Sequence, residues 1–446
     1  MKRKRLLPTA IISCAWVALV LIASANAAVP AAPATPHFDA EAATAAYMAT
    51  IPPKALARSD AYFEGGYWLQ LWDLVVGLAV AWLLLGTGWS RRVRDFAERT
   101  TRFKWLQATI YGAIYFLLIT LLTLPWAAYE GYFREHQYGM SNQDLAGWLG
   151  DTGKGLIISL VFGALSVTVI YAVMRKLTRT WWIWGAAFVV ILFAFLTLIS
   201  PIVLEPVFNK FYPLAEGPLK QQILSLARAN EIPVTNVYEF DASKQTTKIS
   251  AHVSGMLGTA QISLNDNLVN RTSPEAIRAV LGHEMGHYVL NHGYKFLLPV
   301  GLIALLGFLF VARAFSRFAA GRAAQWGIRD VADPAGLPLL AALFSVYLFA
   351  CTPVLNTITR TMEEEADAFG LNASRAPDGF AQAAVAIAEY RKMKPGPVEE
   401  ILLYDHPSGW NRIHRSMLWK AENIDAADIA AYDAAHHPPG TAGYTQ

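Results

Sequence analysis

The fold is decided by residues 181–204, which read WWIWGAAFVVILFAFLTLISPIVL and contain no charged side chain. A helix of about 20 apolar residues can cross the ~30 Å hydrocarbon core of a bilayer. Other stretches with few or no charges lie at residues 67–88, 105–128, 155–174, 294–312 and 336–359. The sequence therefore predicts a mostly α-helical, polytopic membrane protein.

The overall composition agrees with insertion into a lipid bilayer. Of the 446 residues, 54% are hydrophobic and 16% are charged, whereas soluble proteins are about a quarter charged. The net charge of +3 is small, and the sequence has no arginine-rich stripe with interleaved aromatic residues. We therefore expect the bilayer, and no nucleic acid, among the partners.

Residues 6–25 are a seventh candidate span, which follows a basic start at residues 2–5. They could equally be a signal peptide, because Ala25, Asn26 and Ala27 resemble a small-residue cleavage site. Both alternatives put residue 30 on the far side of the membrane. Asp73 is the one carboxylate within a predicted span, and it either contacts an internal cavity or lies at the interface near the helix start.

Basic residues in the short loops predict the orientation. They collect in alternate loops, at Arg91, Arg92, Arg94, Arg99, Arg102, Lys104, Arg175, Lys176, Arg179, Arg313, Arg317, Arg322 and Arg329. The opposite loops, 26–66 and 129–154, hold only Lys54, Arg58, Arg134 and Lys154. The rule places the amino terminus in the cytoplasm and both large polar segments, 205–293 and 360–446, on the other side.

The first polar segment reads as a small α+β unit. Residues 218–230 have the spacing of an amphipathic helix, and residues 234–240 and 260–264 are strand-like, with a glycine turn signal at 255–258. Ser273 and Pro274 are an N-cap and a first-turn proline. They predict a helix from residue 274 to about 290.

The predicted helix carries His283, Glu284 and His287 in the pattern H-E-x-x-H. Positions four apart share one face of a helix, so both imidazoles can bind one Zn²⁺ ion. The glutamate beside them can act as general base toward a water molecule. We therefore predict a catalytic zinc site with Glu284 as the base.

The third ligand is sought among the carboxylates. A metzincin continuation would need Gly at 290 and His at 293, where the chain has Leu and Gly. The next carboxylates, Asp330 and Asp333, lie in a basic loop that is predicted on the opposite side of the membrane from the H-E-x-x-H helix. The following acidic residues are Glu363, Glu364, Glu365 and Asp367. Glu363 and Asp367 are four apart, so one can bind the metal while the other accepts a hydrogen bond from a ligating histidine. A solvated acidic helix start is the plain alternative.

These motifs resemble the Ste24-type CAAX prenyl proteases of the M48 zinc metallopeptidases. The resemblance rests on the zinc helix, on residues 363–369 (EEEADAF) after Arg360, on residues 206–214 and on residues 262–268. It implies about seven transmembrane helices that enclose a water-filled chamber, and a small zincin-like α+β catalytic domain split around the last two spans. It also implies that Glu363 is the third zinc ligand, with Asp367 behind it.

The resemblance implies further site residues. A substrate strand would pair with an edge strand near the zinc by β-augmentation. There the family has Asn-Ala-Tyr and this chain has Ser250, Ala251 and His252. His406, followed by a proline, would stabilise the oxyanion, and Arg412 would support it. His292 lies five residues beyond the zinc motif, and we interpret it as a helix-end cation.

The expected domain organisation has five parts. They are an amino-terminal span or signal peptide with its loop at 1–66, a four-helix membrane region at 67–204, a first catalytic part at 205–293, two spans at 294–359, and a second catalytic part with the tail at 360–446. Residues 272–292 carry too many polar side chains to cross lipid. This argues against an intramembrane protease.

The expected activity is that of an integral membrane zinc metalloendopeptidase. The resemblance implies removal of the carboxy-terminal tripeptide from prenylated proteins. The loop charges favour a bacterial inner-membrane enzyme with a periplasmic active site, or an ER membrane enzyme if the source is eukaryotic. Envelope quality control without prenyl specificity is one alternative, and a non-catalytic channel or metal-binding scaffold is another.

Overall fold

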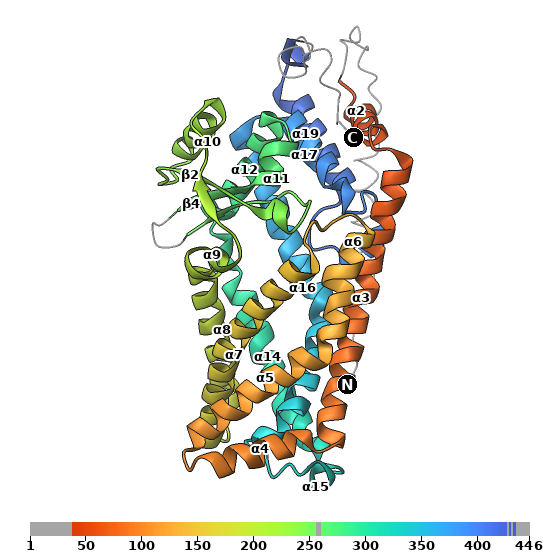
Figure 1. The fold of residues 1–446 in the computed structure, drawn as a ribbon. Coiled ribbons are helices and arrows are strands. Elements are labelled where there is room, and N and C mark those ends of the chain that lie inside the picture. Colours follow the sequence, from red (N-terminus) through yellow and green to blue (C-terminus); the bar gives the residue numbers. More distant parts are fainter. Residues whose placement is uncertain (1–37, 256–259, 426–427, 430, 434–446) are drawn as a thin grey trace, which may run out of the picture. The chain divides into compact units, whose positions relative to one another are not determined.

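The computed structural model describes residues 38–255, 260–425, 428–429 and 431–433. The chain divides into two compact units, one formed by residues 40–423 and the other by residues 1–39 with 424–446. All the elements named below lie in the unit 40–423 (Figure 1). The seventh candidate span, 6–25, lies outside the described residues.

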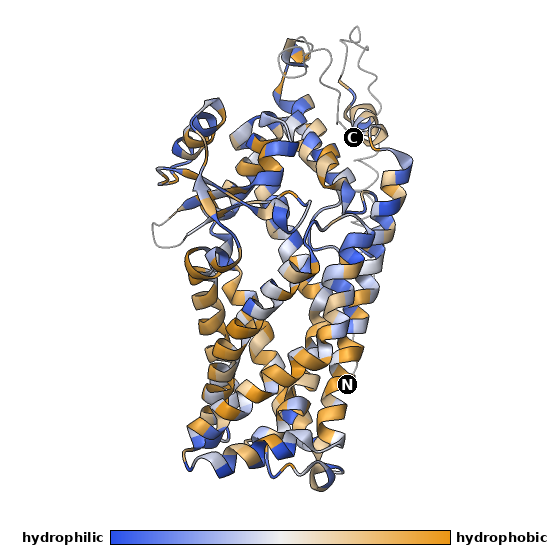
Figure 2. Cartoon of the chain, viewed as in Figure 1, coloured by the Kyte–Doolittle hydropathy of each residue, from blue (hydrophilic) through white to orange (hydrophobic). Residues whose placement is uncertain are grey.

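Six helices among the described residues are long and apolar enough to span a membrane (Figure 2). This confirms the six membrane spans that were predicted between residues 67 and 359. They are α3 (Pro53–Gly86), α5 (Lys104–Ala128), α7 (Leu145–Lys176), α8 (Trp181–Ile199), α14 (Leu297–Ala319) and α16 (Leu337–Ser374). Hydropathy marks only the apolar part of each helix, because backbone hydrogen bonds continue through polar residues. Helix α3 accordingly begins at Pro53 rather than 67, and α16 runs to Ser374 rather than ending at 359.

Asp73 lies well inside α3, not within two turns of its start. Its Oδ1 accepts a hydrogen bond from Nε1 of Trp126 in α5 at 2.8 Å, at an exposed position. The interpretation of Asp73 as a helix-start residue is therefore wrong. Instead, the carboxylate joins α3 to α5 through this hydrogen bond.

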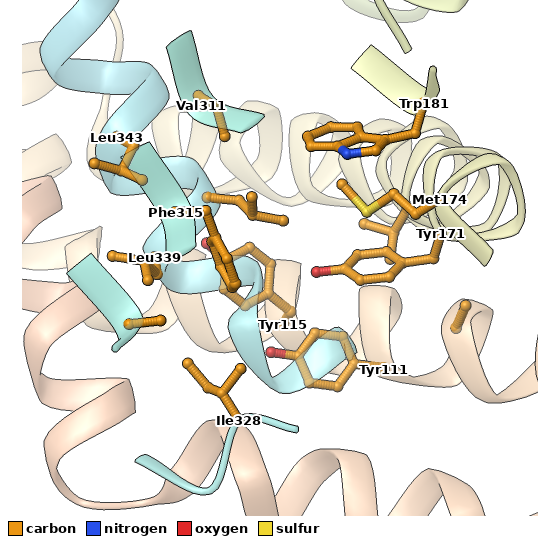
Figure 3. Close-up of a cluster of buried hydrophobic side chains, with 14 of the residues drawn as sticks. Tyr111, Tyr115, Tyr171, Met174, Trp181, Val311, Phe315, Ile328, Leu339 and Leu343 are labelled. Atoms are coloured by element: carbon orange, nitrogen blue, oxygen red, sulfur yellow. The ribbon is translucent and has the colours of Figure 1, made fainter. Parts of the chain in front are cut away.

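Buried aromatic and aliphatic side chains hold the membrane helices together (Figure 3). The cluster includes Tyr111, Tyr171, Phe315 and Leu343, which come from α5, α7, α14 and α16. Close helix approaches depend on small residues. A Cβ at Gly185 of α8, for example, would come within 2.6 Å of the Phe308 ring in α14.

The basic loops contact one another at the ends of the long helices opposite the sheet (Figure 1). Helix α4 (Trp89–Thr100) lies there with the short α15 (Ala323–Trp326). Arg94 is buried and forms an ion pair with Asp333, and its Nη1 also donates to the Gly327 carbonyl at 2.8 Å. Arg329 pairs with Glu98 at 2.6 Å. These contacts join two loops that the charge pattern put on one side.

The polar segments form a four-stranded sheet with helices on it. The strand order is β1-β2-β4-β3, with β1 (Phe211–Pro213), β2 (Val237–Phe240), β3 (Ala251–Ser254) and β4 (Gln261–Asn265). Strands β2 and β4 are parallel, whereas β1 and β3 pair antiparallel at the two edges. The two predicted strands are confirmed as β2, which is shorter than predicted, and β4, which is shifted by one residue. The periodicity missed β1 and β3, which have only three and four residues.

One face of this sheet packs on helices. Val237, Ile262 and Leu264 share a buried core with Leu281 and Met285 of helix α12 (Pro274–Val289). The remaining α-helices of the unit are α2 (Ala40–Ala49), α6 (Glu135–Gln137), α9 (Glu205–Phe208), α10 (Pro218–Ala229), α11 (Asp266–Arg271), α12 (Pro274–Val289), α13 (His292–Lys295), α17 (Pro377–Ala386), α18 (Pro397–Leu403) and α19 (Gly409–Asn423). The predicted amphipathic helix and the predicted helix with the H-E-x-x-H motif are confirmed as α10 and α12.

Candidate metal centre

Helix α12 positions the two histidines of the H-E-x-x-H motif. Ser273 caps the helix, since its side chain accepts a hydrogen bond from the Ala276 amide at 3.1 Å, and Pro274 occupies the first turn. One turn separates His283 from His287, so their rings face the same side. Their Nε2 atoms lie 3.1 Å apart.

Glycines bring helix α16 against this face of α12. A Cβ at Gly370 would lie 2.6 Å from the His283 amide nitrogen, and one at Gly282 would lie 2.9 Å from the Gly370 carbonyl. Gly286 is also close to α16, because its Cβ would come within 3.1 Å of the Ala366 backbone. Backbone contact of this kind requires glycine. It allows acidic side chains of α16 to reach both histidines.

Glu363 is the acidic residue that meets both imidazoles. Its Oε2 lies 3.2 Å from Nε2 of His283, and its Oε1 lies 3.3 Å from Nε2 of His287. One ligand atom from each of the three side chains lies within 4.8 Å of the others. The Oε2 atom is buried, yet it has no hydrogen-bond partner among the described residues. Two imidazoles and an unsatisfied buried carboxylate oxygen fit a divalent cation.

Asp367 lies one turn further along α16, behind the first histidine. Its Oδ1 is 2.8 Å from Nδ1 of His283, and Arg412 of α19 donates to both of its carboxylate oxygens. Burial lowers the pKa of His283, but the nearby carboxylates of Asp367 and Glu363 outweigh this effect and raise it to about 9. Burial would likewise lower the pKa of Arg412, whereas Asp367 raises it. Arg412 thus contacts the Asp367–His283 pair.

Glu284 lies between the two histidines in sequence and is partly exposed. Burial raises the pKa of its carboxyl, and the neighbouring His283 and His287 oppose that rise. A carboxylate with a raised pKa holds a proton more readily at neutral pH. This is the property that a general base must have once it has taken a proton from water.

His406 approaches the same carboxylate from the loop before α19. Its Nε2 lies 3.3 Å from Oε2 of Glu363, and its Nδ1 lies 2.8 Å from Oδ1 of Asp405. The aspartate orients the imidazole so that Nε2 points toward the histidine cluster. Asp405 was missed from the sequence, although it directly precedes His406, because residue type alone does not reveal a hydrogen bond.

His292 is not a helix-end cation at the surface, so that interpretation is wrong. Asn291 takes a left-handed conformation, with φ 59° and ψ 37°, which ends α12 and begins α13. The turn buries His292 at 4% exposure, with Nδ1 2.9 Å from Nδ1 of His287. Its Nε2 lies 3.1 Å from Oε2 of Glu365. Asn tolerates the left-handed region, so Asn291 was the available signal for this turn.

The three expected substrate-binding residues lie at the open edge of the sheet. Ser250 precedes β3 and exchanges hydrogen bonds with Asn265, while Ala251 packs toward the apolar core. His252 lies on the opposite face, with Nε2 3.3 Å from Oε2 of Glu205. Strand β3 pairs only with β4 among the described strands. Its other edge could therefore accept a peptide strand.

Two family models together match most of the chain. Residues 213–417 match peptidase family M48, and residues 37–210 match the CAAX prenyl protease N-terminal model, described as five membrane helices. The junction at 210–213 falls at strand β1, after the first four apolar helices. Both halves of the described fold thus have known counterparts.

Individual relatives agree with the models. The uncharacterized metalloprotease YhfN of Bacillus subtilis is 31% identical over 368 residues, which are 82% of this chain and 86% of that protein. CAAX prenyl protease 1 of Saccharomyces cerevisiae is 34% identical over 178 residues, 39% of each chain. The crystal structure of S. mikatae Ste24p has a TM-score of 0.67 at 20% identity and covers 93% of this chain and 100% of that one. The fold is therefore shared with that structure.

Proposed function

The chain belongs to peptidase family M48, and from this membership we propose that it is a membrane-embedded zinc endopeptidase with its active site at His283, His287 and Glu363. It is a multi-pass membrane metallopeptidase that resembles CAAX prenyl protease. The observation that carries the proposed site is the convergence of the three ligand atoms within 4.8 Å. Peptides or proteins are its substrates.

Zinc is the metal that this donor set favours. Two imidazoles with one carboxylate are one of the three-ligand sets found in catalytic zinc sites, which leave one position open. When bound, zinc supplies Lewis acidity, which polarises a carbonyl group and makes water nucleophilic near neutral pH. Asp367 holds Nδ1 of His283, so that Nε2 of this imidazole points at Glu363.

Glu284 carries the proton transfers in this proposal. Its carboxylate takes a proton from the attacking water and returns it to the amine that leaves. The raised pKa described above suits both steps, because the group must bind the proton and then release it. Such proton transfer contributes about 10²- to 10⁴-fold to a rate.

His406 stabilises the oxyanion that develops at the scissile carbonyl. Asp405 accepts a hydrogen bond from Nδ1 of His406. A neutral imidazole therefore directs its single N–H at the aspartate, and only a protonated imidazole also has an N–H at Nε2 to donate. Arg412 supports the site through Asp367, and Ser250, Ala251 and His252 align the peptide strand.

The central experiment compares the wild type with Glu284→Gln. We expect Glu284→Gln to abolish cleavage of a quenched peptide while it retains about one zinc ion per chain by elemental analysis. Treatment of the wild type with a chelator removes both zinc and activity. A Gln variant that still turned over the peptide would contradict the assigned base, and a wild type without any chelator-sensitive activity would favour the non-catalytic scaffold.

Two substrate classes separate the possible physiological roles. The resemblance to CAAX prenyl protease 1 favours prenylated carboxy termini, whereas the basic loops and the bacterial relative favour envelope proteins without prenyl groups. Mass spectrometry of products from matched farnesylated and unmodified peptides tests this choice. Equal cleavage of both would support the envelope role.

The side of the active site is tested by a reporter at the carboxy terminus. We propose that segments 205–293 and 360–446 lie on the periplasmic side of a bacterial inner membrane, because the arginine-rich loops favour the cytoplasm. A reporter that is active only in the periplasm should then give signal. The same reporter inserted after Gly321, in the basic loop, is the matched control and should be silent.

A further inference from the structure

Both nitrogen atoms of His292 have a partner inside the protein. Nδ1 lies 2.9 Å from Nδ1 of His287, and Nε2 lies 3.1 Å from Oε2 of Glu365. The side chain of His292 is 5% exposed, whereas that of Glu365 is 49% exposed and also lies 3.5 Å from Lys295. The contacts thus run from the histidine cluster, through a buried imidazole, to a carboxylate at the surface.

The positions of the hydrogens on the two imidazole rings decide which atom donates in each of these contacts. A contact between two imidazole nitrogens is a hydrogen bond only when one of them carries hydrogen and the other does not. If His287 binds a metal through Nε2, its hydrogen is on Nδ1, so that Nδ1 of His292 must accept. The hydrogen of a neutral His292 is then on Nε2, where the Glu365 carboxylate accepts it.

The two histidines of the zinc motif therefore have different supports. His283 contacts the carboxylate of Asp367, which Arg412 binds from the other side. At its Nδ1, His287 contacts the imidazole of His292, and the Glu365 carboxylate lies beyond that ring. Partners of this kind fix the tautomer and ring orientation of a ligating histidine, and their loss costs about 10- to 100-fold in metal affinity.

We propose that His292 is a positioning residue for the metal site, which holds His287 in the tautomer and orientation that ligation needs, while Glu365 sets the direction of the hydrogen bond. The proposal rests on the proposed function, because it takes His287 as a metal ligand. The contact between His292 and His287 depends on the left-handed turn at Asn291, which brings residue 292 back toward the face of α12.

The test measures zinc affinity and ligand geometry in the full-length protein, purified in detergent, without use of peptidase activity. His292→Leu keeps an apolar volume but removes both hydrogen bonds. His292→Asn keeps an acceptor at the position of Nδ1. Glu365→Gln weakens the acceptor for Nε2, and Glu364→Gln is its matched control, because Glu364 contacts Arg415 instead.

We expect His292→Leu to weaken zinc binding 10- to 100-fold by chelator competition, and to change the visible spectrum of the cobalt-substituted protein. His292→Asn should restore affinity to within about threefold of wild type. Glu365→Gln should weaken binding more than Glu364→Gln does. A role in packing alone would lower the melting temperature and leave the cobalt spectrum unchanged.

Wild-type affinity and spectrum in His292→Leu would overturn the inference and leave the proposed metal site intact. Equal loss in the Leu and Asn variants would overturn the acceptor role of Nδ1. A wild type that binds neither zinc nor cobalt in a saturable manner would contradict the proposed metal site, and the inference with it.

Discussion

Arg412 binds Asp367 at two points, through Nε to Oδ2 at 3.0 Å and through Nη2 to Oδ1. The side chain of Asp367 is 3% exposed and that of Arg412 is 15% exposed. The pair connects helix α19 to helix α16, and Asp367 also holds His283. A contact between residues far apart in sequence thus fixes the first histidine of the zinc motif.

Loss of Arg412 should be costly, because it leaves a buried carboxylate without its cation. We expect Arg412→Met to lower the free energy of unfolding by about 3 kcal/mol, measured as a lower melting temperature in detergent. The control is Arg415→Met, since Arg415 lies 3.4 Å from Glu364 with both side chains exposed. Its loss should cost less than about 1 kcal/mol. Equal effects of the two variants would show that the buried Arg412–Asp367 pair contributes no more to stability than the exposed Arg415–Glu364 pair.

Asp405 should act on catalysis only through His406. Removal of an oxyanion donor lowers kcat by about 10²- to 10³-fold, so we expect this loss for His406→Ala and a smaller one for Asp405→Asn. Because both act on the same interaction, the double variant should be no slower than His406→Ala alone. Zinc content by elemental analysis should remain at the wild-type level. Additive losses would mean that Asp405 has a separate role.

Zinc binding should strengthen as the pH rises. In the metal-free protein His283 has a pKa of about 9, so below that pH the imidazole carries a proton that the metal must displace. Affinity should therefore rise up to about tenfold per pH unit between pH 6 and 9 and level off above that. Calorimetry in buffers of different ionisation enthalpy should detect about one proton released per zinc at pH 7. Binding that is independent of pH across this range would contradict the raised pKa.

Gly370 should tolerate no side chain. Its Cβ would lie 2.6 Å from the His283 amide, so Gly370→Ala must push α16 away from α12 and carry Glu363 away from the histidines. We expect a loss of about 1 to 3 kcal/mol in stability and weaker zinc binding by chelator competition. Gly155→Ala is the control, because nothing lies within 4 Å of a Cβ there. Intact zinc affinity in Gly370→Ala would show that the helices can separate without harm to the site.

Local patterns in the sequence were sufficient to predict the membrane helices and the helix with the H-E-x-x-H motif. Hydropathy depends only on the side chains of one segment, so the six described spans could be found although their ends could not. The cap at Ser273 and the four-residue spacing of His283 and His287 are likewise local. They predicted helix α12 and its shared histidine face.

The choice among the acidic residues needed more than local pattern. Residues 363–367 offer four carboxylates, and spacing alone left both Glu363 and Asp367 open as ligands. The resemblance to a known family favoured Glu363. In the structure, the approach of α16 at Gly282 and Gly370 directs Glu363 toward both Nε2 atoms and Asp367 toward Nδ1 of His283.

By itself, then, the sequence determined that this is a helical membrane protein with an H-E-x-x-H helix, because hydropathy and helical periodicity are properties of single segments. Only the tertiary structure decided what surrounds the motif. Asp405, His292 and Glu365 reach it through a loop conformation, a left-handed turn at Asn291 and the packing of α16. Those features depend on contacts between segments that no single stretch of sequence contains.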